Sequence, residues 1–467
     1  MSIENTHYGA ERIKEMLLDC KSVYFLGIGG INMSSLAHIT HTRGYRVGGS
    51  DRTLSRLTER LAREGIEIFE GHDEKNLSGY DALVYTVAVS ADNPEYVSAR
   101  ERGIPCISRA DYMGYIMTEY KTRIGISGMH GKSTCTSMCA EVLMAADIDP
   151  TVLSGAELDS MGGAWRIGKN EKFVFEACEY MDSFLDFNPT IAVILNIEMD
   201  HVDYFKSMEQ IRASYGRFAS IAGSEGVCVA NSDDSDVMEA VKDFEGKIIT
   251  FGIDDENANV RAENIRIEKG RYSFSVRCNG ELYCNVKLSV TGYHNIYNAL
   301  ASAAVAYVCG IDGEAVRRGL AAFCGAKRRM EYKGECNGAS LYDDYGHHPT
   351  EVKTTLKGAK DMTDGRLFCV FQPHTYSRTS ALFDDFADAL RVADRVIVSQ
   401  IYAARETDTL GVSAQRLAKA VGNGAAAAES FSEAAEFLER ELQSGDVAVV
   451  MGAGDVWRVF DHIKTEK

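Results

Sequence analysis

The sequence predicts an α/β protein of three domains, each built around a largely parallel sheet. Strand-like apolar runs alternate with helical patterns from one end of the 467-residue chain to the other, which is typical of parallel α/β folds rather than of sandwiches or bundles. Glycine-rich turns follow three of these runs, at 27–30, 128–131 and 452–454. We therefore expect two Rossmann-like units on either side of a central unit of the P-loop type.

Composition limits the classes of function. With 45% hydrophobic and 25% charged residues, the chain is typical of a soluble globular protein with about two to four domains. Its formal net charge is -18 and its pI is about 5.1. Binding to nucleic acid or to anionic membranes depends on basic patches, so this charge argues against both. An anionic ligand must instead meet local positive charge.

The termini and the cysteines favour a cytoplasmic protein. The segment 1–5 has no basic and apolar signal pattern, and no apolar stretch reaches the length of a membrane span. The 12 cysteines are scattered, with no C-x-x-C pair and no zinc-like spacing. We expect them to be small core residues in a reducing compartment, and we expect no membrane insertion.

The first unit, predicted to span 1–118, begins with a strand at 23–26, a glycine turn and a helix ending near Arg43. The turn Gly27-Ile28-Gly29-Gly30 is similar to a dinucleotide fingerprint, although Asn32 stands where that fingerprint has its third glycine. Further strands end at Asp51 and near Thr86. A carboxylate at position 51 is placed to contact a ribose. We favour a nucleotide diphosphate over NAD, with a ligand-free tight turn as the alternative.

The second unit, predicted to span 119–324, contains a phosphate loop between a strand at 123–126 and a helix from Ser133 onward. Its glycine-rich turn allows backbone N–H groups to face an anion, with Lys132 near the terminal phosphates and the Ser133 hydroxyl near Mg²⁺. Five residues separate Gly125 from Gly131, rather than the four of a standard Walker motif. The motif is therefore better written G-x-H-G-K-S-T, starting at Gly128.

Two later strands of this unit end in groups that suit a metal–nucleotide site. Glu176 closes the strand 173–176, and Asp200 with His201 follows the strand 191–195. The carboxyl ends of parallel strands meet at one edge of a sheet, so these groups should lie beside the phosphate loop and hold Mg²⁺. Beyond them, alternating residues at 259–291 predict a small antiparallel insert, followed by an alanine-rich helix at 294–309 and a shorter helix ending near Cys324.

The third unit, predicted to span 325–467, has strands at 367–371, 396–399 and 447–451. Before them, Asp343-Asp344-Tyr345-Gly346-His347-His348-Pro349 gathers two acids and two histidines around a turn. Zinc is one interpretation, but no third ligand stands at helical spacing. A catalytic or phosphate-contacting loop is favoured, and simple turn chemistry is the remaining alternative.

Eight ordered motifs together resemble the Mur ligase family over nearly the whole chain. They are GIGGINMS (27–34), GMHGKST (128–134), EACEYMDSF (176–184), NIEMDH (196–201), GYHNIYNALA (292–301), GAKRRME (325–331), DDYGHHPTE (343–351) and FQPHTYSRT (371–379). The resemblance implies a UDP-sugar domain, a central ATPase domain and an amino-acid domain. It also implies that ATP activates the lactyl carboxylate of UDP-N-acetylmuramate as an acyl phosphate, which the amine of L-alanine then attacks.

The resemblance also implies roles for individual residues. Gly128, Gly131, Lys132, Ser133, Thr134, Asn295 and Arg329 are expected to bind ATP, and Ser133, Glu176 and His201 are expected to bind Mg²⁺. Substrate contacts are expected from Gly29, Gly30, Ser34, Asp51, Arg109, His130, Tyr345, His348 and His374. The catalytic assignments are Lys132, His130, His347 and Arg378.

Other functions remain open at the level of sequence. A related ligase that recycles a muramyl tripeptide, a non-catalytic UDP-sugar-binding protein and an NAD-dependent dehydrogenase each explain part of the pattern. The dehydrogenase leaves Gly128 to Thr134 without a purpose. Met129 and Ser133 replace two threonines of the usual family loop, and Ser133 keeps the hydroxyl that Mg²⁺ needs. We expect a monomer or a homodimer.

Overall fold

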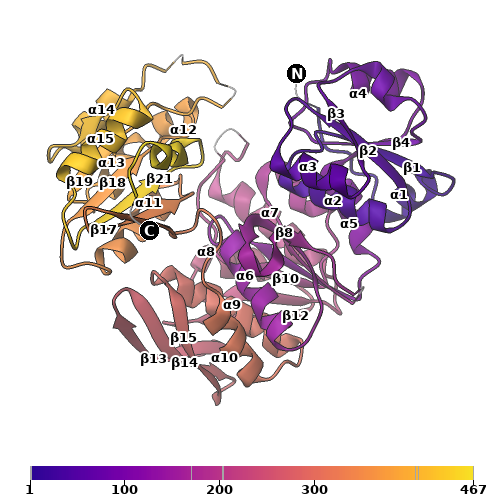
Figure 1. Cartoon of the computed structure of the whole chain (residues 1–467). Coiled ribbons are helices and arrows are strands. Elements are labelled where there is room, and N and C mark those ends of the chain that lie inside the picture. Colours follow the sequence, from indigo (N-terminus) through magenta and orange to yellow (C-terminus); the bar gives the residue numbers. More distant parts are fainter. Residues whose placement is uncertain (1–2, 170, 202–203, 405, 409, 466–467) are drawn as a thin grey trace.

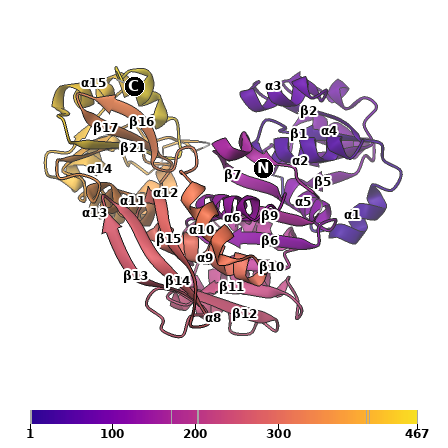
Figure 2. The same cartoon turned by 60° about the horizontal axis from the view of Figure 1, so that its bottom comes forward.

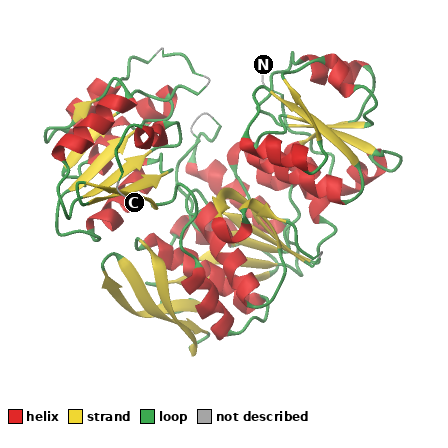
Figure 3. Cartoon of the chain, viewed as in Figure 1, coloured by secondary structure: helices red, strands yellow, loops and turns green. Residues whose placement is uncertain are grey.

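The computed structural model describes residues 3–169, 171–201, 204–404, 406–408 and 410–465. It contains three sheets that follow one another along the chain, in indigo, in magenta to salmon, and in orange to yellow in Figure 1. Helices cover the faces of these sheets, as the secondary-structure colouring shows (Figure 3). The three-domain α/β fold predicted from the sequence is confirmed.

The N-terminal sheet has five parallel strands in the order β3-β2-β1-β4-β5. They are β1 (Ser22–Leu26), β2 (Arg46–Asp51), β3 (Glu67–Glu70), β4 (Ala82–Tyr85) and β5 (Cys106–Ser108). The helices are α1 (Ala10–Met16), α2 (Ile31–Thr42), α3 (Arg56–Arg63), α4 (Pro94–Glu101) and α5 (Arg109–Met117), with a 3₁₀ turn η1 (Glu74–Leu77). The order in which strands are added reverses between β1 and β4, which leaves a crevice beyond their carboxyl ends.

The central sheet has ten strands in the order β15-β14-β13-β12-β11-β10-β6-β9-β7-β8. They are β6 (Thr122–Ser127), β7 (Thr151–Leu158), β8 (Gly163–Arg166), β9 (Lys172–Glu176), β10 (Ile191–Ile194), β11 (Val227–Asn231), β12 (Lys247–Gly252), β13 (Val260–Glu268), β14 (Arg271–Cys278) and β15 (Glu281–Thr291). The predicted antiparallel insert is β13–β15. It is not a separate sheet, because β13 pairs in parallel with β12 and so extends the central sheet.

The helices of the central unit are α6 (Lys132–Ala145), α7 (Met208–Ser220), α8 (Ser235–Val241), α9 (His294–Val308) and α10 (Gly313–Ala322), with 3₁₀ turns η2 (Asp159–Met161) and η3 (Tyr180–Asp186). Helix α9 is the predicted alanine-rich helix, and it is buried along most of its length. Small side chains let backbones approach closely, so α9 packs directly against α6, which follows the phosphate loop.

The C-terminal sheet has the order β16-β17-β21-β18-β19-β20, in which β16 alone is antiparallel to its neighbour. Its strands are β16 (Glu331–Cys336), β17 (Ala339–Asp344), β18 (Leu367–Phe371), β19 (Arg395–Val398), β20 (Ala426–Ala427) and β21 (Val447–Met451). The helices are α11 (Pro349–Lys360), α12 (Tyr376–Ala381), α13 (Phe383–Leu390), α14 (Ala414–Val421) and α15 (Phe431–Glu441), with η4 (Val456–Asp461).

The three units meet around the central sheet, as the turned view shows (Figure 2). Trp165 of β8 donates from Nε1 to His38 Nδ1 of α2 at 3.0 Å, and the Arg60 guanidinium of α3 lies 4.4 Å from the indole centroid. These contacts join the N-terminal unit to the edge of the central sheet.

Helix length and cysteine burial bear on two features of the composition. Among the described residues, no helix is both long enough and apolar enough to cross a membrane. Most cysteines are buried or half-buried, but Cys324 is exposed, so the expectation that all 12 are core residues is wrong for this one. It follows α10, where the chain leaves the central unit.

Candidate active site at the domain junction

The phosphate loop is held open by its two glycines and by one asparagine. Gly128 has φ 139° and Gly131 has φ 84°, and Gly131 caps the N-terminus of α6. A Cβ on Gly131 would lie 2.5 Å from Asn298 Oδ1 of α9. Asn196 braces the loop, because its Oδ1 accepts from His130 N at 2.8 Å and its Nδ2 donates to His130 O at 3.0 Å. The backbone amides at the start of α6 therefore face an open site for an anion.

Lys132 lies at the centre of this loop as a half-buried cation. Its Nζ donates to Gly128 O at 2.5 Å and pairs with Glu179 Oε2 at 3.0 Å. Burial opposes the charge, but the Glu179 carboxylate raises the pKa of Lys132 overall. Glu179 also pairs with His201 Nε2 at 3.1 Å. Sequence reasoning missed Glu179, although it lies three residues after Glu176 in the same acidic motif.

The predicted magnesium ligands converge on the same loop. The Ser133 hydroxyl donates to Glu176 Oε2 at 2.8 Å, and Gly155 N donates to that oxygen at 2.9 Å. His201 reaches the same area through Glu179. Oxygen donors in this arrangement fit Mg²⁺, which favours carboxylate and hydroxyl ligands. Asp200 is not one of this group, because its carboxylate pairs with Arg378 at 3.2 Å.

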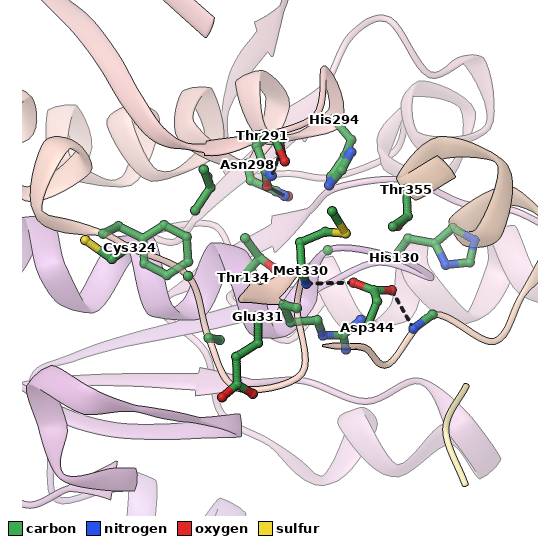
Figure 4. A pocket seen from close by; sticks show the side chains of 18 of the residues that line it. His130, Thr134, Thr291, His294, Asn298, Cys324, Met330, Glu331, Asp344 and Thr355 are labelled. Carbon is green, nitrogen blue, oxygen red and sulfur yellow. Dashed lines mark hydrogen bonds between the residues drawn. The ribbon is translucent and has the colours of Figure 1, made fainter. Parts of the chain in front are cut away.

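A cavity of about 890 Å³ opens beside the loop, between α6, α9 and the start of the C-terminal unit (Figure 4). Its lining includes the predicted ATP residues Gly131, Thr134, Asn295 and Arg329, together with His130, His294 and Asn298. Asp344 shapes one wall by accepting from Met330 N at 2.9 Å and from Gly346 N at 2.8 Å, drawn as dashed lines in Figure 4. This size and lining suit a nucleotide.

Arg328 and Arg329, at the start of the C-terminal unit, make different contacts. Arg328 is fixed to the glycine turn of β21, where it donates to Gly452 O at 2.6 Å and pairs with Asp343 at 3.3 Å. Arg329 instead lines the cavity, with its guanidinium 5.2 Å from the Tyr345 ring centroid. The structure thus places Arg329, and not Arg328, beside the predicted nucleotide.

The two consecutive histidines of the turn 343–349 face different neighbours. The His347 ring lies 5.6 Å from Tyr345 and 5.8 Å from His374, while the His348 ring lies 4.9 Å from His130. Burial lowers the pKa of His347 to about 4. The zinc interpretation, which needed both rings at one ion, is therefore not favoured by their positions.

His374 and Arg378 complete the group around His347. Arg378 Nη1 lies 3.3 Å from His374 Nδ1, and the Tyr402 ring stacks on His374 at 5.5 Å with an interplanar angle of 12°. Tyr402 was not among the predicted site residues. Its place depends on a bridge between residues 374 and 402 that no local pattern signals.

His130 lies between two carboxylates from two domains. Glu198 lies 3.5 Å from its Nε2 and Glu351 lies 3.2 Å from its Nδ1. Burial alone lowers the pKa of an imidazole, but these two carboxylates raise the pKa of His130 to about 9. Ligand atoms of His130, Glu198 and His348 lie within 4.8 Å of one another. Neither glutamate was predicted as a site residue.

Hydrogen bonds within the protein hold the N-terminal glycine turn in place. Gly27 N and Ile28 N donate to Ser50 O at 2.9 and 3.0 Å, and Gly29 N donates to Asp51 Oδ2 at 2.9 Å. Asp51 therefore supports the turn as well as lying at the predicted ribose position. Gly30 caps α2, which leaves the first α2 amides facing the crevice.

The remaining two predicted substrate residues differ in burial. The Ser34 side chain is fully buried and donates to Ile28 O at 2.6 Å, so it holds the same turn from behind. Arg109 begins α5 in a half-buried position near Cys178 and Asp186, and desolvation lowers its pKa. It therefore lies at the border between the N-terminal unit and the acidic motif.

Three family models match the chain in the order of its sheets. The Mur ligase family catalytic domain matches residues 22–121, the Mur ligase middle domain matches 126–306, and the Mur ligase glutamate ligase domain matches 328–454. The chain belongs to the Mur ligase family. The family resemblance inferred from the eight motifs is confirmed.

Curated Mur ligases align along nearly the full length of this chain. A UDP-N-acetylmuramate–L-alanine ligase from Clostridium novyi is 46% identical over 442 residues, covering 94% of this chain and 96% of the relative. One from Caldanaerobacter subterraneus is 46% identical and covers 96% and 98%. The solved UDP-N-acetylmuramate–alanine ligase of Thermotoga maritima has a TM-score of 0.79 at 29% identity, covering 94% of this chain and 97% of that structure.

Proposed function

We propose that this Mur ligase joins L-alanine to the lactyl carboxylate of UDP-N-acetylmuramate, consuming ATP and releasing ADP and phosphate. The observation that carries the proposal is that Lys132, Ser133 and Glu176 lie together beside a nucleotide-sized cavity. The lining of this cavity includes Gly131 and Thr134 of the same loop and helix, and Asp344 and Gly346 of the C-terminal turn 343–349. Relatives named for this reaction, 46% identical over nearly the whole chain, support it.

The first step transfers the γ-phosphoryl group of ATP to a carboxylate oxygen of the UDP-sugar, and ADP leaves. A carboxylate is a poor electrophile, and the phosphoryl group gives it a leaving group. Lys132 would stabilise charge on the transferring phosphoryl group from its fixed position in the loop. Ser133, Glu176 and His201 would hold Mg²⁺, which supplies electrostatic stabilisation of the phosphate oxygens.

The second step forms the amide bond. The amine nitrogen of alanine attacks the acyl carbon, the bond to the phosphate oxygen breaks, and phosphate leaves. Tyr345, His347, His374 and Arg378 form the group that would receive the amino acid, because they lie together on the C-terminal unit facing Asp200. An acyl phosphate reacts with water, so closure of the C-terminal unit over the site would protect it.

We further propose that the chain divides functionally into a UDP-sugar domain at 1–118, an ATP domain at 119–324 and an amino-acid domain at 325–467. In this arrangement Gly29, Gly30 and Asp51 face the UDP moiety, Asn295 lies against adenine, and Arg329 reaches the phosphates. The enzyme would work in the cytoplasm, as a monomer or a homodimer, in peptidoglycan precursor synthesis.

Phosphate release in the presence of Mg·ATP and UDP-N-acetylmuramate tests the proposal. L-alanine, glycine, L-serine and the tripeptide L-alanyl-γ-D-glutamyl-meso-diaminopimelate are added in separate reactions. We expect release to require an amino acid and to be fastest with L-alanine. Release with the tripeptide alone would indicate a recycling ligase, and tight UDP-sugar binding without release would indicate a binding protein.

A further inference from the structure

Glu351 divides its two carboxylate oxygens between two domains. It is the third residue of α11, and its Oε2 accepts from His347 N at 2.9 Å and from His348 N at 3.3 Å. Its Oε1 crosses the domain junction to His130 Nδ1, at 3.2 Å. The side chain is 14% exposed. One half-buried carboxylate therefore contacts both the histidine turn of the C-terminal unit and the phosphate loop of the central unit.

A second contact closes the junction from the opposite side. Thr350 Oγ1 donates to Glu198 Oε2 at 2.7 Å, and the same oxygen lies 3.5 Å from His130 Nε2. Each ring nitrogen of His130 thus lies within ion-pair distance of a carboxylate, and these two negative charges favour the charged imidazolium form. The other titratable groups facing this ring are His348 and His294.

Helix capping alone does not account for this arrangement. Helix α15 has the same local pattern, in which Ser430 caps the helix and Glu433, its third residue, accepts from Glu429 N at 2.7 Å. Within the part of the chain that the structure describes, the Glu433 carboxylate makes no hydrogen bond or ion pair with another domain. The cap explains one oxygen of Glu351, whereas the second oxygen contacts a residue 221 positions away in the sequence.

We infer that Glu351 is a positioning residue, which sets the His130 ring and the histidine turn 347–348 in one fixed relation when the two domains meet. This inference rests on the proposed ligase reaction, because that reaction needs the phosphorylated carboxylate and the attacking amine in register. A displacement of about 1 Å between reacting groups lowers a rate by roughly a hundredfold. The turn and the loop carry those two groups.

The test compares Glu351→Gln with Glu433→Gln, two matched changes at the third residue of a capped helix in the same domain. Glutamine keeps an acceptor oxygen for the helix cap but removes the charge that pairs with His130. We expect Glu351→Gln to lower kcat about 10- to 100-fold, with the Kd values of ATP and UDP-N-acetylmuramate changed less than about threefold. Glu433→Gln should leave kcat within about twofold of the wild type.

A double-mutant cycle with His130→Asn separates positioning from a local role. If Glu351 acts through His130, the double variant is no slower than the slower single variant. Multiplied effects, or a wild-type kcat in Glu351→Gln, would overturn the inference. A similar fall of unfolding midpoint in both glutamine variants, without loss of kcat, would reduce Glu351 to a helix cap.

A measurement that needs no turnover keeps the inference distinct from the proposed reaction. Titration of the His130 imidazole by NMR should give a lower pKa in Glu351→Gln than in the wild type, because one of its two carboxylate partners is neutral. An unchanged His130 pKa contradicts the pairing whether or not the enzyme makes an amide. Absence of wild-type turnover, in contrast, contradicts the proposed reaction alone. If Glu351→Gln does not fold, His130→Asn removes the same pairing from the other partner, and a wild-type kcat there would contradict the inference.

Discussion

Lys132, Ser133 and Glu176 were predicted from one loop and one strand end, and the structure brings them together as expected. Such groups are predictable because a glycine turn after a strand fixes where its neighbours point. Glu198 and Glu351 were missed for the opposite reason. Their partner His130 lies in another part of the sequence. Taken locally, Glu351 fits a helix cap and Glu198 fits a solvated loop after a strand.

Lys132→Ala is expected to abolish turnover, by at least about a thousandfold, because no other cation described in the loop takes its place beside the phosphates. UDP-N-acetylmuramate binding should remain within about threefold of the wild type, since the glycine turn at 27–30 lies in another domain. Steady-state phosphate release and calorimetric titration measure the two quantities. The control is Lys242→Ala, which changes an exposed lysine of the same unit. If Lys132→Ala loses UDP-N-acetylmuramate binding as well as turnover, the two sites are not separate.

At the level of elements, fully buried apolar strands were predicted, whereas the shortest strands were not. The predicted runs 367–371 and 447–451 coincide with β18 and β21, whose residues are all buried. The two-residue β20 and the three-residue β5 are too short to show any periodicity. The insert at 259–291 was predicted as antiparallel, but its connection to β12 depends on pairing across two residues only. Sequence alone does not specify such a short pairing.

The start of α6 offers a test of loop geometry. Gly131→Ala must accept φ 84° and must also push its Cβ against Asn298 Oδ1, whereas Gly44→Ala, at φ 87°, meets open space. Both changes should lower the free energy of unfolding by about 1–3 kcal/mol through the backbone alone. Only Gly131→Ala should also weaken ATP binding, by at least about tenfold. Denaturant titration and ATP calorimetry measure these effects, and equal ATP affinity in the two variants would contradict the assignment of the loop.

At the scale of the whole molecule, the N-terminal and central units are tightly joined. The C-terminal unit meets the central unit beside the cavity. The buried indole of Trp165 in the central unit contacts the N-terminal unit, through a hydrogen bond to α2 and a cation–π contact with α3. The C-terminal unit meets the central one largely through ion pairs and hydrogen bonds, including Arg378 with Asp200 and Thr350 with Glu198. Polar junctions of this kind separate at lower cost than packed apolar ones.

Trp165→Phe tests the joined pair. The phenyl ring keeps most of the packing, but His38 loses its donor and Arg60 loses the indole. We expect the free energy of unfolding to fall by about 1–3 kcal/mol, with ATP affinity unchanged. Trp457→Phe, at the other tryptophan of the chain, which is 43% exposed, should change stability by less than about 0.5 kcal/mol. Equal stabilities of the two variants, measured by denaturant titration, would contradict a structural role for the contact.

The linker into the C-terminal unit places Arg329 between two residues with left-handed backbones, Arg328 at φ 58° and Met330 at φ 49°. Arg328 is tied to the last strand of that unit, and Lys327 N is tied to Glu157 O of the central unit at 2.9 Å. Any swing of the domain about this short segment must carry the Arg329 guanidinium along an arc. Opening of the C-terminal unit would then move the Arg329 guanidinium away from the proposed position of the nucleotide phosphates. The same movement would therefore release both ADP and the finished amide.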